Sequence, residues 1–347
     1  MARDPDGSSA AAGAAAWADA ADRAGADVHA RFGHRILGLP ATWLGAAERP
    51  APSPRTPWHY WWQAHYLDAV LDAGGRKLRD GGHWEPELAR AGALLRGIRL
   101  RNLGTLRNAY FDDMAWLALA ADRLNLFSLA ATGHPHRPAV RAVATLRRQL
   151  LAAHDDVLGG GLYWSRKRDY KNTPVNGPAA LFFARTGEPA RAAALLNWLG
   201  TTLRDPVTGL YLDGIHPADH AVERPLYTYN QGPAVAALLA LGHPQMVTDA
   251  SAVIAAVDHH LTRADGTRPL VLHEGGDGNL FTGILCRYLA LASRSDLLPA
   301  ATRATAARLV HRSASALPPP PAGRAVLSWH LARWTIFEAA ATCPPPS

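Results

Sequence analysis

Two consecutive aspartates, Asp112 and Asp113, are the residues of this chain best suited to chemistry. They lie in the segment R-N-A-Y-F-D-D-M-A-W, which runs from Arg107 to Trp116. Aromatic residues flank the pair and an apolar run follows it, so a helix is expected to begin here. A carboxylate in the first turn of a helix can simply satisfy backbone N–H groups and complement the helix dipole. The alternative interpretation is a buried acid pair with a catalytic role.

Polar and aromatic side chains recur together near the starts of five expected helices. This combination suits a sugar site, because pyranose C–H faces lie on aromatic rings while amide, carboxylate and ammonium groups bind the hydroxyls. Each aromatic residue taken singly is better explained as a core anchor, and the repetition favours a carbohydrate groove. The five clusters are Trp61, Trp62, Gln63 and His65; Asn108, Tyr110, Asp112 and Asp113; Tyr163, Trp164, Tyr170, Lys171, Asn172 and Asn176; Tyr227, Tyr229, Asn230 and Gln231; and Asp277, Asn279 and Phe281.

The aspartate pair fits the chemistry of such a groove. Glycoside hydrolysis needs one carboxyl group to protonate the leaving oxygen and another to attack the anomeric carbon or activate water. Consecutive helical residues diverge by about 100°, yet in a first turn both side chains can lean into one crevice. Carboxyl groups about 5 Å apart favour retention of configuration. Their repulsion raises one pKa and so creates the acid.

Helical periodicity dominates the rest of the chain, with Gly and Pro marking most helix ends. A Pro-rich loop is expected at Pro50–Pro57, and strand signals are confined to short runs at Gly161–Trp164 and Gly209–Asp213. The pattern predicts twelve helices, at residues 10–35, 58–79, 86–101, 113–132, 138–154, 174–185, 189–203, 231–241, 245–262, 279–293, 300–315 and 323–342.

The connections between these helices predict the architecture. The glycine-bearing segments G-G-L-Y-W, T-G-L-Y-L-D-G and D-G-T-R recur at intervals of roughly fifty residues, the length of one helix pair in a repeat-built fold. We therefore expect an all-α fold, an (α/α)6 toroid or barrel of six helical hairpins. It forms a single catalytic domain over residues 1–347, with a disordered tail at residues 1–9 and a second tail at 343–347. Loops at one end of the inner helix ring would line the groove.

Composition excludes several other classes of protein. The formal net charge of +7 comes from scattered basic residues without a Lys/Arg block, so no nucleic-acid partner is expected. Cys286 and Cys343 are the only cysteines, which argues against a disulfide framework and a zinc site. The sequence contains neither an H-E-x-x-H nor a G-x-S-x-G motif. No stretch is apolar enough to span a membrane. The N-terminal residues lack a signal peptide, which predicts a cytoplasmic protein unless export follows an unconventional route.

Six segments together carry a family resemblance. They are Y-W-W-Q-A-H from Tyr60, R-N-A-Y-F-D-D-M-A-W from Arg107, G-G-L-Y-W from Gly160, Y-K-N-T-P-V-N-G from Tyr170, Y-T-Y-N-Q-G from Tyr227 and G-D-G-N-L-F-T-G-I-L-C-R-Y-L from Gly276. In order and spacing they resemble the bacterial endo-α-1,6-mannanases of glycoside hydrolase family 76, which are related to fungal wall transglycosidases. The resemblance implies an α/α barrel that acts on a mannan or a lipomannan-type glycolipid without a cofactor or metal, and we expect a monomer.

The resemblance also implies roles for individual residues. Asp112 would be the nucleophile and Asp113 the acid/base. Trp62, Trp164 and Tyr229 would stack on mannose rings, and Gln63, Lys171, Asn172, Asn176, Asn230 and Gln231 would orient hydroxyls. Further substrate contacts are expected from His65, Asn108, Tyr110, Asp277 and Phe281. The chain departs from the family pattern at Gly177, Pro178 and His65, where we expect altered subsites.

Two alternatives remain open on the sequence. A transglycosidase would use the same acid pair and pass the sugar to a hydroxyl group instead of water. A non-catalytic glycan-binding protein would keep the groove without turnover, although binding alone does not require paired acids.

Overall fold

The computed structural model describes residues 5–49, 58–319 and 323–345, and for residues 5–12 it describes the backbone alone. Twelve α-helices account for most of this part of the chain. The expected Pro-rich loop at 50–57 lies outside the described residues. The first helix begins at Pro5, so residues 5–9, which were expected to belong to a tail, are helical.

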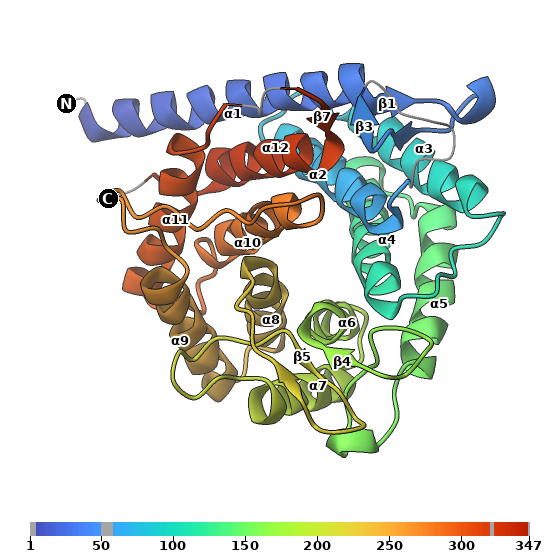
Figure 1. Cartoon of the computed structure of the whole chain (residues 1–347). Helices are drawn as coiled ribbons and strands as arrows, with labels where there is room; N and C mark the ends of the chain where they lie inside the picture. The colour runs from blue at the N-terminus through green and yellow to red at the C-terminus, as the bar shows by residue number, and fades with distance from the viewer. Residues whose placement is uncertain (1–4, 50–57, 320–322, 346–347) are drawn as a thin grey trace.

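Six helices form a closed inner ring in which each helix packs against the next and α12 returns to α2. Figure 1 shows this ring, with the other six helices outside it. The inner helices are α2 (Tyr60–Arg79), α4 (Phe111–Thr132), α6 (Thr173–Arg185), α8 (Thr228–Leu241), α10 (Gly278–Ala292) and α12 (Leu327–Thr342). The outer helices are α1 (Pro5–Phe32), α3 (Glu85–Arg101), α5 (Arg137–Ala152), α7 (Pro189–Thr202), α9 (Pro244–His260) and α11 (Ala300–Ser315). The predicted (α/α)6 barrel is confirmed.

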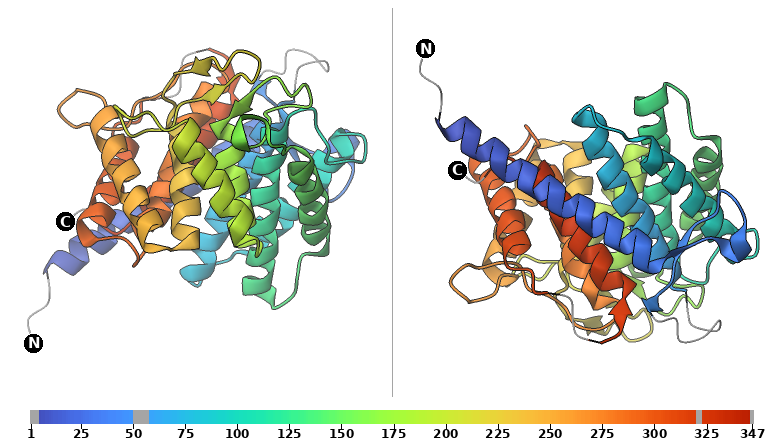
Figure 2. Two further views of the ribbon diagram at one scale, coloured as in Figure 1. Left: turned by 90° about the horizontal axis from the view of Figure 1, so that it is seen from below. Right: turned by 90° about the horizontal axis from the view of Figure 1, so that it is seen from above.

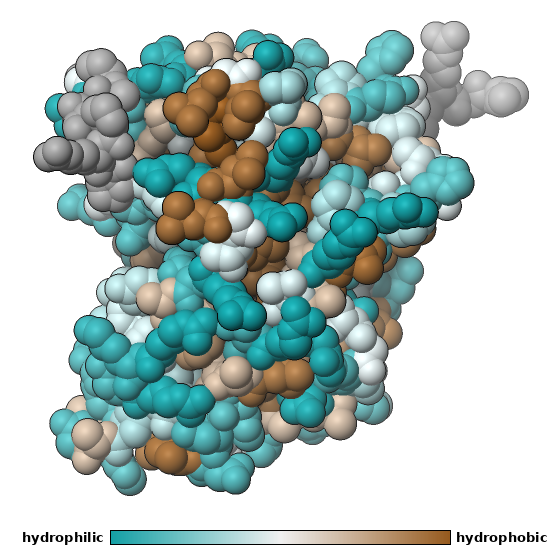
Figure 3. Space-filling model, turned by 90° about the vertical axis from the view of Figure 1, so that its right-hand side faces the viewer, coloured by the Kyte–Doolittle hydropathy of each residue, from teal (hydrophilic) through white to brown (hydrophobic). Residues whose placement is uncertain are grey.

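The inner helices are buried nearly all round, whereas the outer helices are amphipathic. In α4 the unbroken stretch from Met114 to Asp122 is buried, while α5 buries only one stripe. A helix that is apolar on every side must be surrounded by other elements, and a striped helix must face water on one side. Figure 3, seen from the side of α3 and α5, shows polar side chains over much of this outer surface.

Helix boundaries follow the predicted start and stop signals. Proline occupies the first turn of α3, α5, α6, α7 and α9, where its missing N–H costs nothing. Gly133 ends α4 with a φ of 74°, a conformation that favours glycine. The helix α12 begins at Leu327 instead of residue 323 because Ala325–Val326 forms strand β7.

Short strands gather at the end of the ring where the inner helices begin, as Figure 2 shows. β1 (Gly33–His34) pairs with β2 (Leu44–Gly45), and β3 (Glu48–Arg49) pairs with β7. β4 (Lys171–Asn172), β5 (Gly214–Ile215) and β6 (Val222–Glu223) form an antiparallel sheet in that order. Two 3-10 turns, η1 (Ile36–Gly38) and η2 (Val157–Gly159), complete the elements.

The three glycine-bearing segments form equivalent reverse turns after successive outer helices. Isolated bridges join His154 to Leu162 after α5, Arg204 to Tyr211 after α7, and Thr262 to Leu270 after α9. The expected hairpins at residues 161–164 and 209–213 are therefore bridged turns, and the named strands lie beside them. The chain returns at the same place in three consecutive repeats, as the spacing of these segments predicted.

Three further sequence expectations concern cysteines, membrane spans and metal sites. Cys286 and Cys343 are both free and buried. Across residues 5–49, 58–319 and 323–345, no helix combines the length and apolarity needed to cross a bilayer. The same ranges hold no group of three or more His, Cys, Asp or Glu residues placed to bind a metal ion.

Candidate active site

A cavity of about 510 Å³ opens at the N-terminal end of the inner ring. Five inner helices, α2, α4, α6, α8 and α10, contribute to it through their first turns or the loops that precede them. Its lining residues are His59, Tyr60, Trp61, Tyr110, Asp112, Asp113, Trp116, Trp164, Tyr170, Asn172, Asp213, Tyr229, Asp277 and Phe281. The helix starts expected to build a groove are thus brought together.

Asp112 is the second residue of α4, directly after Phe111 at the start of the helix. Its Oδ2 accepts a hydrogen bond from Trp164 Nε1 at 2.9 Å, and its Oδ1 accepts one from the backbone N–H of Asp113 at 2.9 Å. Burial raises the pKa of Asp112 to about 7, although both hydrogen bonds oppose the rise and favour the ionised form. This carboxylate therefore satisfies a backbone N–H group and also faces the cavity.

Asp113 has a different environment one residue further on. It accepts a hydrogen bond at Oδ2 from the side-chain amide of Asn108. Burial, followed by the charge of Asp112, raises the pKa of Asp113 well above its ordinary value, and the more distant Asp277 adds to the rise. Asn108 opposes this rise. Asp113 therefore keeps its proton to a higher pH than a solvated aspartate does.

Neighbouring acids with unequal hydrogen-bond support can divide the work of an acid and a base. Asp112 has two N–H donors directed at its oxygens, while Asp113 has one side-chain donor. None of the described residues lining the cavity is a lysine or an arginine, so neither carboxylate is neutralised there by a permanent cation. The pair can present one protonated carboxyl group and one carboxylate to a bound molecule.

Aromatic rings form the walls around the acid pair. Tyr229 stacks on Phe281 with centroids 3.9 Å apart and planes 6° apart, and Trp116 lies 6.4 Å from Tyr229. On the other side, Tyr110 and Trp164 lie 4.9 Å apart. Such rings offer flat apolar surfaces to the C–H faces of a sugar. Of the predicted substrate contacts, Tyr110, Trp164, Asn172, Tyr229, Asp277 and Phe281 line the cavity, and Asn108 supports Asp113.

Three predicted hydroxyl ligands instead bind the protein backbone. Gln63, Asn176 and Gln231 are fully buried at the fourth position of α2, α6 and α8. The oxygen of each accepts from a backbone N–H of the segment that precedes its helix, at Gly45, Leu162 and Tyr211, each at 2.8–2.9 Å. The amide nitrogen donates to the carbonyl of the same loop residue and to one further carbonyl near the helix start.

These three side chains, which we call the amide clamps, hold the loops against the inner helices. Their donors and acceptors are used by backbone groups, and none of them lines the cavity. The prediction that Gln63, Asn176 and Gln231 orient sugar hydroxyls is therefore corrected. A side-chain amide offers the same donors and acceptor whether it binds buried backbone groups or sugar hydroxyls. Residue type therefore could not distinguish the two roles.

Lys171 and Asn230 are also corrected from direct to indirect roles. Lys171 is fully buried, and its Nζ donates to Asp155 Oδ1 at 2.8 Å and to the carbonyls of Val157 and Gly160, each at 2.7 Å. Asn230 lies behind the cavity wall, where its amide donates to Asp213 at 3.2 Å. Lys171 therefore orders the turn around Val157 and Gly160, and Asn230 supports the Asp213 carboxylate that lines the cavity.

Trp62 and His65 lie behind the wall as well. Trp62 is 2% exposed, stacks on His59 at 4.0 Å and donates its Nε1 to Asp277 at 2.7 Å. Trp61, its neighbour in sequence, lines the cavity in its place. His65 is buried between Trp61 and Trp116, with centroid distances of 5.3 and 4.9 Å. Burial lowers the pKa of His65 well below its ordinary value, so its ring is neutral.

Gly177 and Pro178, the other departures from the family pattern, lie inside α6 and are buried away from the cavity. A Cβ atom on Gly177 would lie 3.5 Å from Pro233 of α8. These residues pack one inner helix against the next. Gly177, Pro178 and His65 can therefore affect the subsites only indirectly, through the packing of the inner helices.

Asp213 is the main site residue that the sequence did not reveal. It belongs to the loop before α8 and lines the cavity, where it accepts from Tyr170 Oη at 2.8 Å as well as from Asn230. Burial raises the pKa of Asp213. The only signal was its place in T-G-L-Y-L-D-G, one of the repeated glycine-bearing segments. Trp61 and Tyr170, members of the predicted clusters without an assigned substrate contact, also line the cavity. Trp116, His59 and Tyr60 are further lining residues that were not predicted to bind substrate.

A ring of parallel inner helices that holds an acid pair between aromatic walls defines a glycosidase of the α/α-barrel class. The chain belongs to glycosyl hydrolase family 76, whose family model matches residues 45–318. This match confirms the resemblance drawn from the sequence motifs. Comparison with curated protein sequences found no match.

Solved structures of similar proteins agree with the family assignment. The GH76A alpha-1,6-mannanase from Salegentibacter sp. HEL1_6 is 27% identical, with a TM-score of 0.81 over 94% of this chain and 99% of that one. Another structure of that enzyme is an inactive variant, in which two consecutive aspartates are replaced by asparagine, in complex with alpha-1,6-mannotriose.

Two further structures extend the comparison. The Lin0763 protein from Listeria innocua is 26% identical, with a TM-score of 0.78 over 94% of this chain and 97% of that one. Dfg5 from Chaetomium thermophilum, solved in complex with glucosamine, is 14% identical, with a TM-score of 0.71 over 95% of this chain and 92% of that one. At this level of identity the likeness to Dfg5 is one of fold alone.

Proposed function

We propose that this chain is a retaining glycosidase that cleaves internal α-1,6-mannosidic bonds, with Asp112 as nucleophile and Asp113 as acid/base. The observation that carries the proposal is the unequal hydrogen-bond support of two consecutive half-buried carboxyl groups. Asp112 receives the Trp164 and backbone N–H donors that stabilise an anion. Burial and the neighbouring charge of Asp112 raise the pKa of Asp113, which favours its protonated form.

The proposed reaction has two balanced steps. In the first, Asp113 donates its proton to the glycosidic oxygen while an oxygen of Asp112 attacks the anomeric carbon. The C–O bond to the leaving sugar breaks, and a covalent glycosyl ester forms. In the second, ionised Asp113 takes a proton from water, whose oxygen displaces Asp112 from the anomeric carbon. Each group returns to its starting state.

The substrate class rests on family membership and on the relatives. The mannanase from Salegentibacter, at 27% identity, is named for alpha-1,6-mannan, and its variant with two replaced aspartates was solved with alpha-1,6-mannotriose. In this chain, two consecutive aspartates face a cavity whose stacked Tyr229 and Phe281 can receive a sugar face. We infer a mannan or the glycan part of a glycolipid as substrate, bound by a monomer.

Replacing each acid by its amide tests the proposal. Asp112→Asn and Asp113→Asn are each expected to lower kcat/KM on α-1,6-mannan by a factor of about 10³ or more, since each removes an essential proton transfer or nucleophile. Asp156→Asn is a matched control, because Asp156 is exposed and also follows another aspartate, Asp155. Near wild-type turnover in either active-site variant would overturn the assigned roles.

Product analysis separates the remaining alternatives. NMR of the first released anomer should show retained α configuration, and inversion would exclude a glycosyl ester on Asp112. Early products longer than disaccharides are expected from cleavage of internal bonds. Transfer to an added mannoside acceptor would identify a transglycosidase that uses the same pair. Glycan binding without released reducing ends would indicate a non-catalytic protein, and light scattering after gel filtration would test the monomer.

A further inference from the structure

A second cavity, of about 130 Å³, lies at the opposite end of the inner ring, among the last turns of the helices. Its most prominent lining groups are arginines, namely Arg79, Arg123, Arg185, Arg287 and Arg294. Family 76 chemistry as proposed above involves none of them. Arginine guanidinium groups present planar sets of N–H donors that suit oxyanions.

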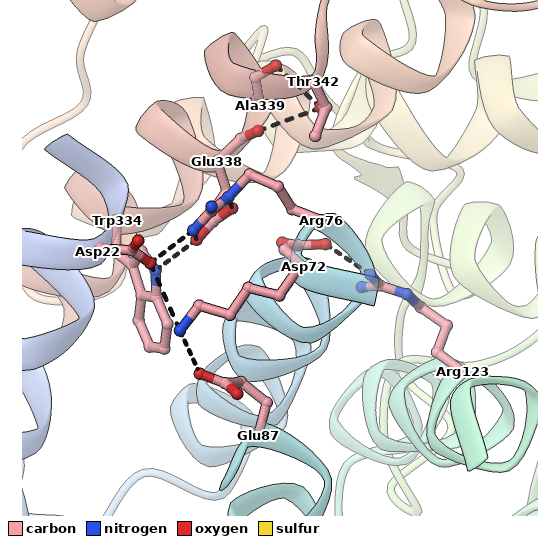
Figure 4. Close-up of polar contacts among 10 residues, drawn as sticks. Asp22, Asp72, Arg76, Glu87, Arg123, Trp334, Glu338, Ala339 and Thr342 are labelled. Carbon is pink, nitrogen blue, oxygen red and sulfur yellow. Dashed lines mark hydrogen bonds and ion pairs between the residues drawn. The ribbon is translucent and has the colours of Figure 1, made fainter. Parts of the chain in front are cut away.

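Two of these arginines are already neutralised by carboxylates. Arg123 donates to Asp68 at 2.6 Å and to Asp72 at 2.5 Å, and Arg287 donates to Asp72 at 2.7 Å. Figure 4 shows Asp72 of α2 directed toward Arg123. The oxygens of Asp72 are thus occupied by two guanidinium groups.

The remaining acid of the cavity is occupied as well. Glu338 Oε2 accepts from Arg76 Nε at 2.8 Å, and its Oε1 accepts from Trp334 Nε1 at 3.1 Å. Figure 4 shows Arg76 held between Glu338 and Asp22. No carboxylate that lines the cavity is left for another arginine.

Three arginines lack a carboxylate partner within the part of the chain that the structure describes. Arg79 and Arg185 form neither an ion pair nor a side-chain hydrogen bond there, and Arg294 donates only to the carbonyl of Ala290, at 3.0 Å. Burial lowers the pKa of Arg185, while burial and the charge of Arg294 lower that of Arg79. Arg185 is half-buried, whereas Arg79 and Arg294 are exposed at the mouth of the cavity. Guanidinium groups that line one cavity repel one another, and a bound anion would relieve this repulsion.

The three groups come from separate parts of the ring. Arg79 ends α2, Arg185 ends α6 and Arg294 follows α10. Because inner helices pack in the order α2, α4, α6, α8, α10 and α12, these are alternate members of the ring. A single small anion among them would receive donors from three directions and would link helices that do not pack side by side.

We propose that the cavity formed by Arg79, Arg185 and Arg294 binds a tetrahedral oxyanion, either inorganic phosphate or the phosphate group of a small phosphorylated molecule. Its size supports this ligand class. A water molecule occupies about 30 Å³ in the liquid, so a cavity of about 130 Å³ has room for a phosphate group. The site is separate from the glycosidase site and does not depend on that function.

Isothermal titration calorimetry of the full chain tests the proposal. Titration with sodium phosphate in a chloride buffer of constant ionic strength should show saturable binding at one site. Arg185→Gln and Arg79→Gln should each weaken it by about tenfold or more, because each removes charged hydrogen-bond donors. Arg141→Gln is the matched control, since Arg141 is exposed on the outer helix α5.

Glycerol 3-phosphate distinguishes the two sources of the phosphate group. Tighter binding of this ester than of inorganic phosphate identifies a phosphorylated molecule, and the reverse order identifies the free ion. Absence of saturable binding, or equal weakening by Arg141→Gln, would overturn the site and leave the arginines as partners of the negative helix ends. Circular dichroism of each variant checks folding, and mannanase activity reports separately on the site at the other end.

Discussion

The two ends of the inner ring treat carboxylates in opposite ways. At the N-terminal end, Asp112, Asp113 and Asp213 are hydrogen-bonded by uncharged indole, amide, backbone or phenol groups. At the C-terminal end, Asp68, Asp72 and Glu338 are bound by guanidinium groups. The acids at both ends are buried or half-buried, and the helix dipoles favour the carboxylates at the first end and the guanidinium groups at the second.

The difference shows what makes a buried acid reactive in this protein. Burial raises a carboxyl pKa, and a permanent cation in contact brings it down again. Neutral donors support an anion without cancelling the effect of burial, so the pKa of Asp112 rises to about 7. The end with paired charges is suited to stability, and the end without them is suited to proton transfer. Four predictions test this contrast.

The largest expected effect is on stability at the end with paired charges. Asp72→Asn should lower the free energy of unfolding by about 3–5 kcal/mol, because Arg123 and Arg287 lose a buried ionic partner. Urea unfolding followed by circular dichroism measures the change. Activity of the folded fraction should stay near that of the wild type, and an unchanged midpoint would show that this ion pair contributes nothing.

Replacing aspartate by asparagine at the catalytic end should raise the free energy of unfolding instead of lowering it. The folded chain keeps the protons of Asp112 and Asp113 to higher pH than the unfolded chain does. Stability should therefore be fully present below about pH 4 and fall as the pH rises toward the folded pKa, which is about 7 for Asp112. The double variant Asp112→Asn/Asp113→Asn should remove this slope and gain on the order of 2 kcal/mol at pH 7. Urea midpoints from pH 4 to pH 8 provide the measurement, and an equal slope in both proteins would contradict it.

Substitutions of an amide clamp and of a cavity residue on α8 should have different effects, the first on the free energy of unfolding and the second on KM. Gln231→Leu leaves the N–H and C=O of Tyr211 without their partner and should cost about 1–3 kcal/mol, with KM unchanged. Tyr229→Leu, two residues earlier, removes a stacked ring from the cavity and should raise KM with a smaller loss of stability. A raised KM in the Gln231 variant would return that residue to the substrate site.

The smallest expected effect concerns the pH profile of activity. The charge of Asp213 contributes to the raised pKa of Asp112. Asp213→Asn should therefore move the acid limb of kcat/KM to lower pH, by less than about one unit. The alkaline limb, assigned to Asp113, should move less, because Asp213 is not among the causes of its raised pKa. A shift of the acid limb to higher pH would show that Asp213 supports ionised Asp112.

Much of the fold could be predicted from the sequence because its signals are local. Apolar periodicity, proline in first turns and glycine after last turns are properties of short segments, and they gave twelve helices in the right order. The acid pair was equally visible, since two carboxylates that open an apolar helix are unusual. Its position at the cavity depends only on the start of α4.

The rest of the site depends on contacts that no local pattern specifies. Whether Trp61 or its neighbour Trp62 faces the cavity is set by the rotation of α2 about its axis, which packing decides. Gln231 and Asn172 are both buried amide residues near helix starts, yet the first binds a loop and the second lines the cavity. Asp213 reaches the site from a long loop between α7 and α8, whose path follows from tertiary structure.

The first helix has a consequence for how the protein folds as it is made. α1 lies across α12 and α2, as the right-hand view in Figure 2 shows, and Asp27 and Asp22 bind His330 and Arg76. Because α1 is synthesised before α12, its buried face stays uncovered until α12 has been made. Contacts this distant in sequence slow folding. The nascent chain has to protect the exposed face of α1 until α12 has been translated, and the ring closes only as α12 docks.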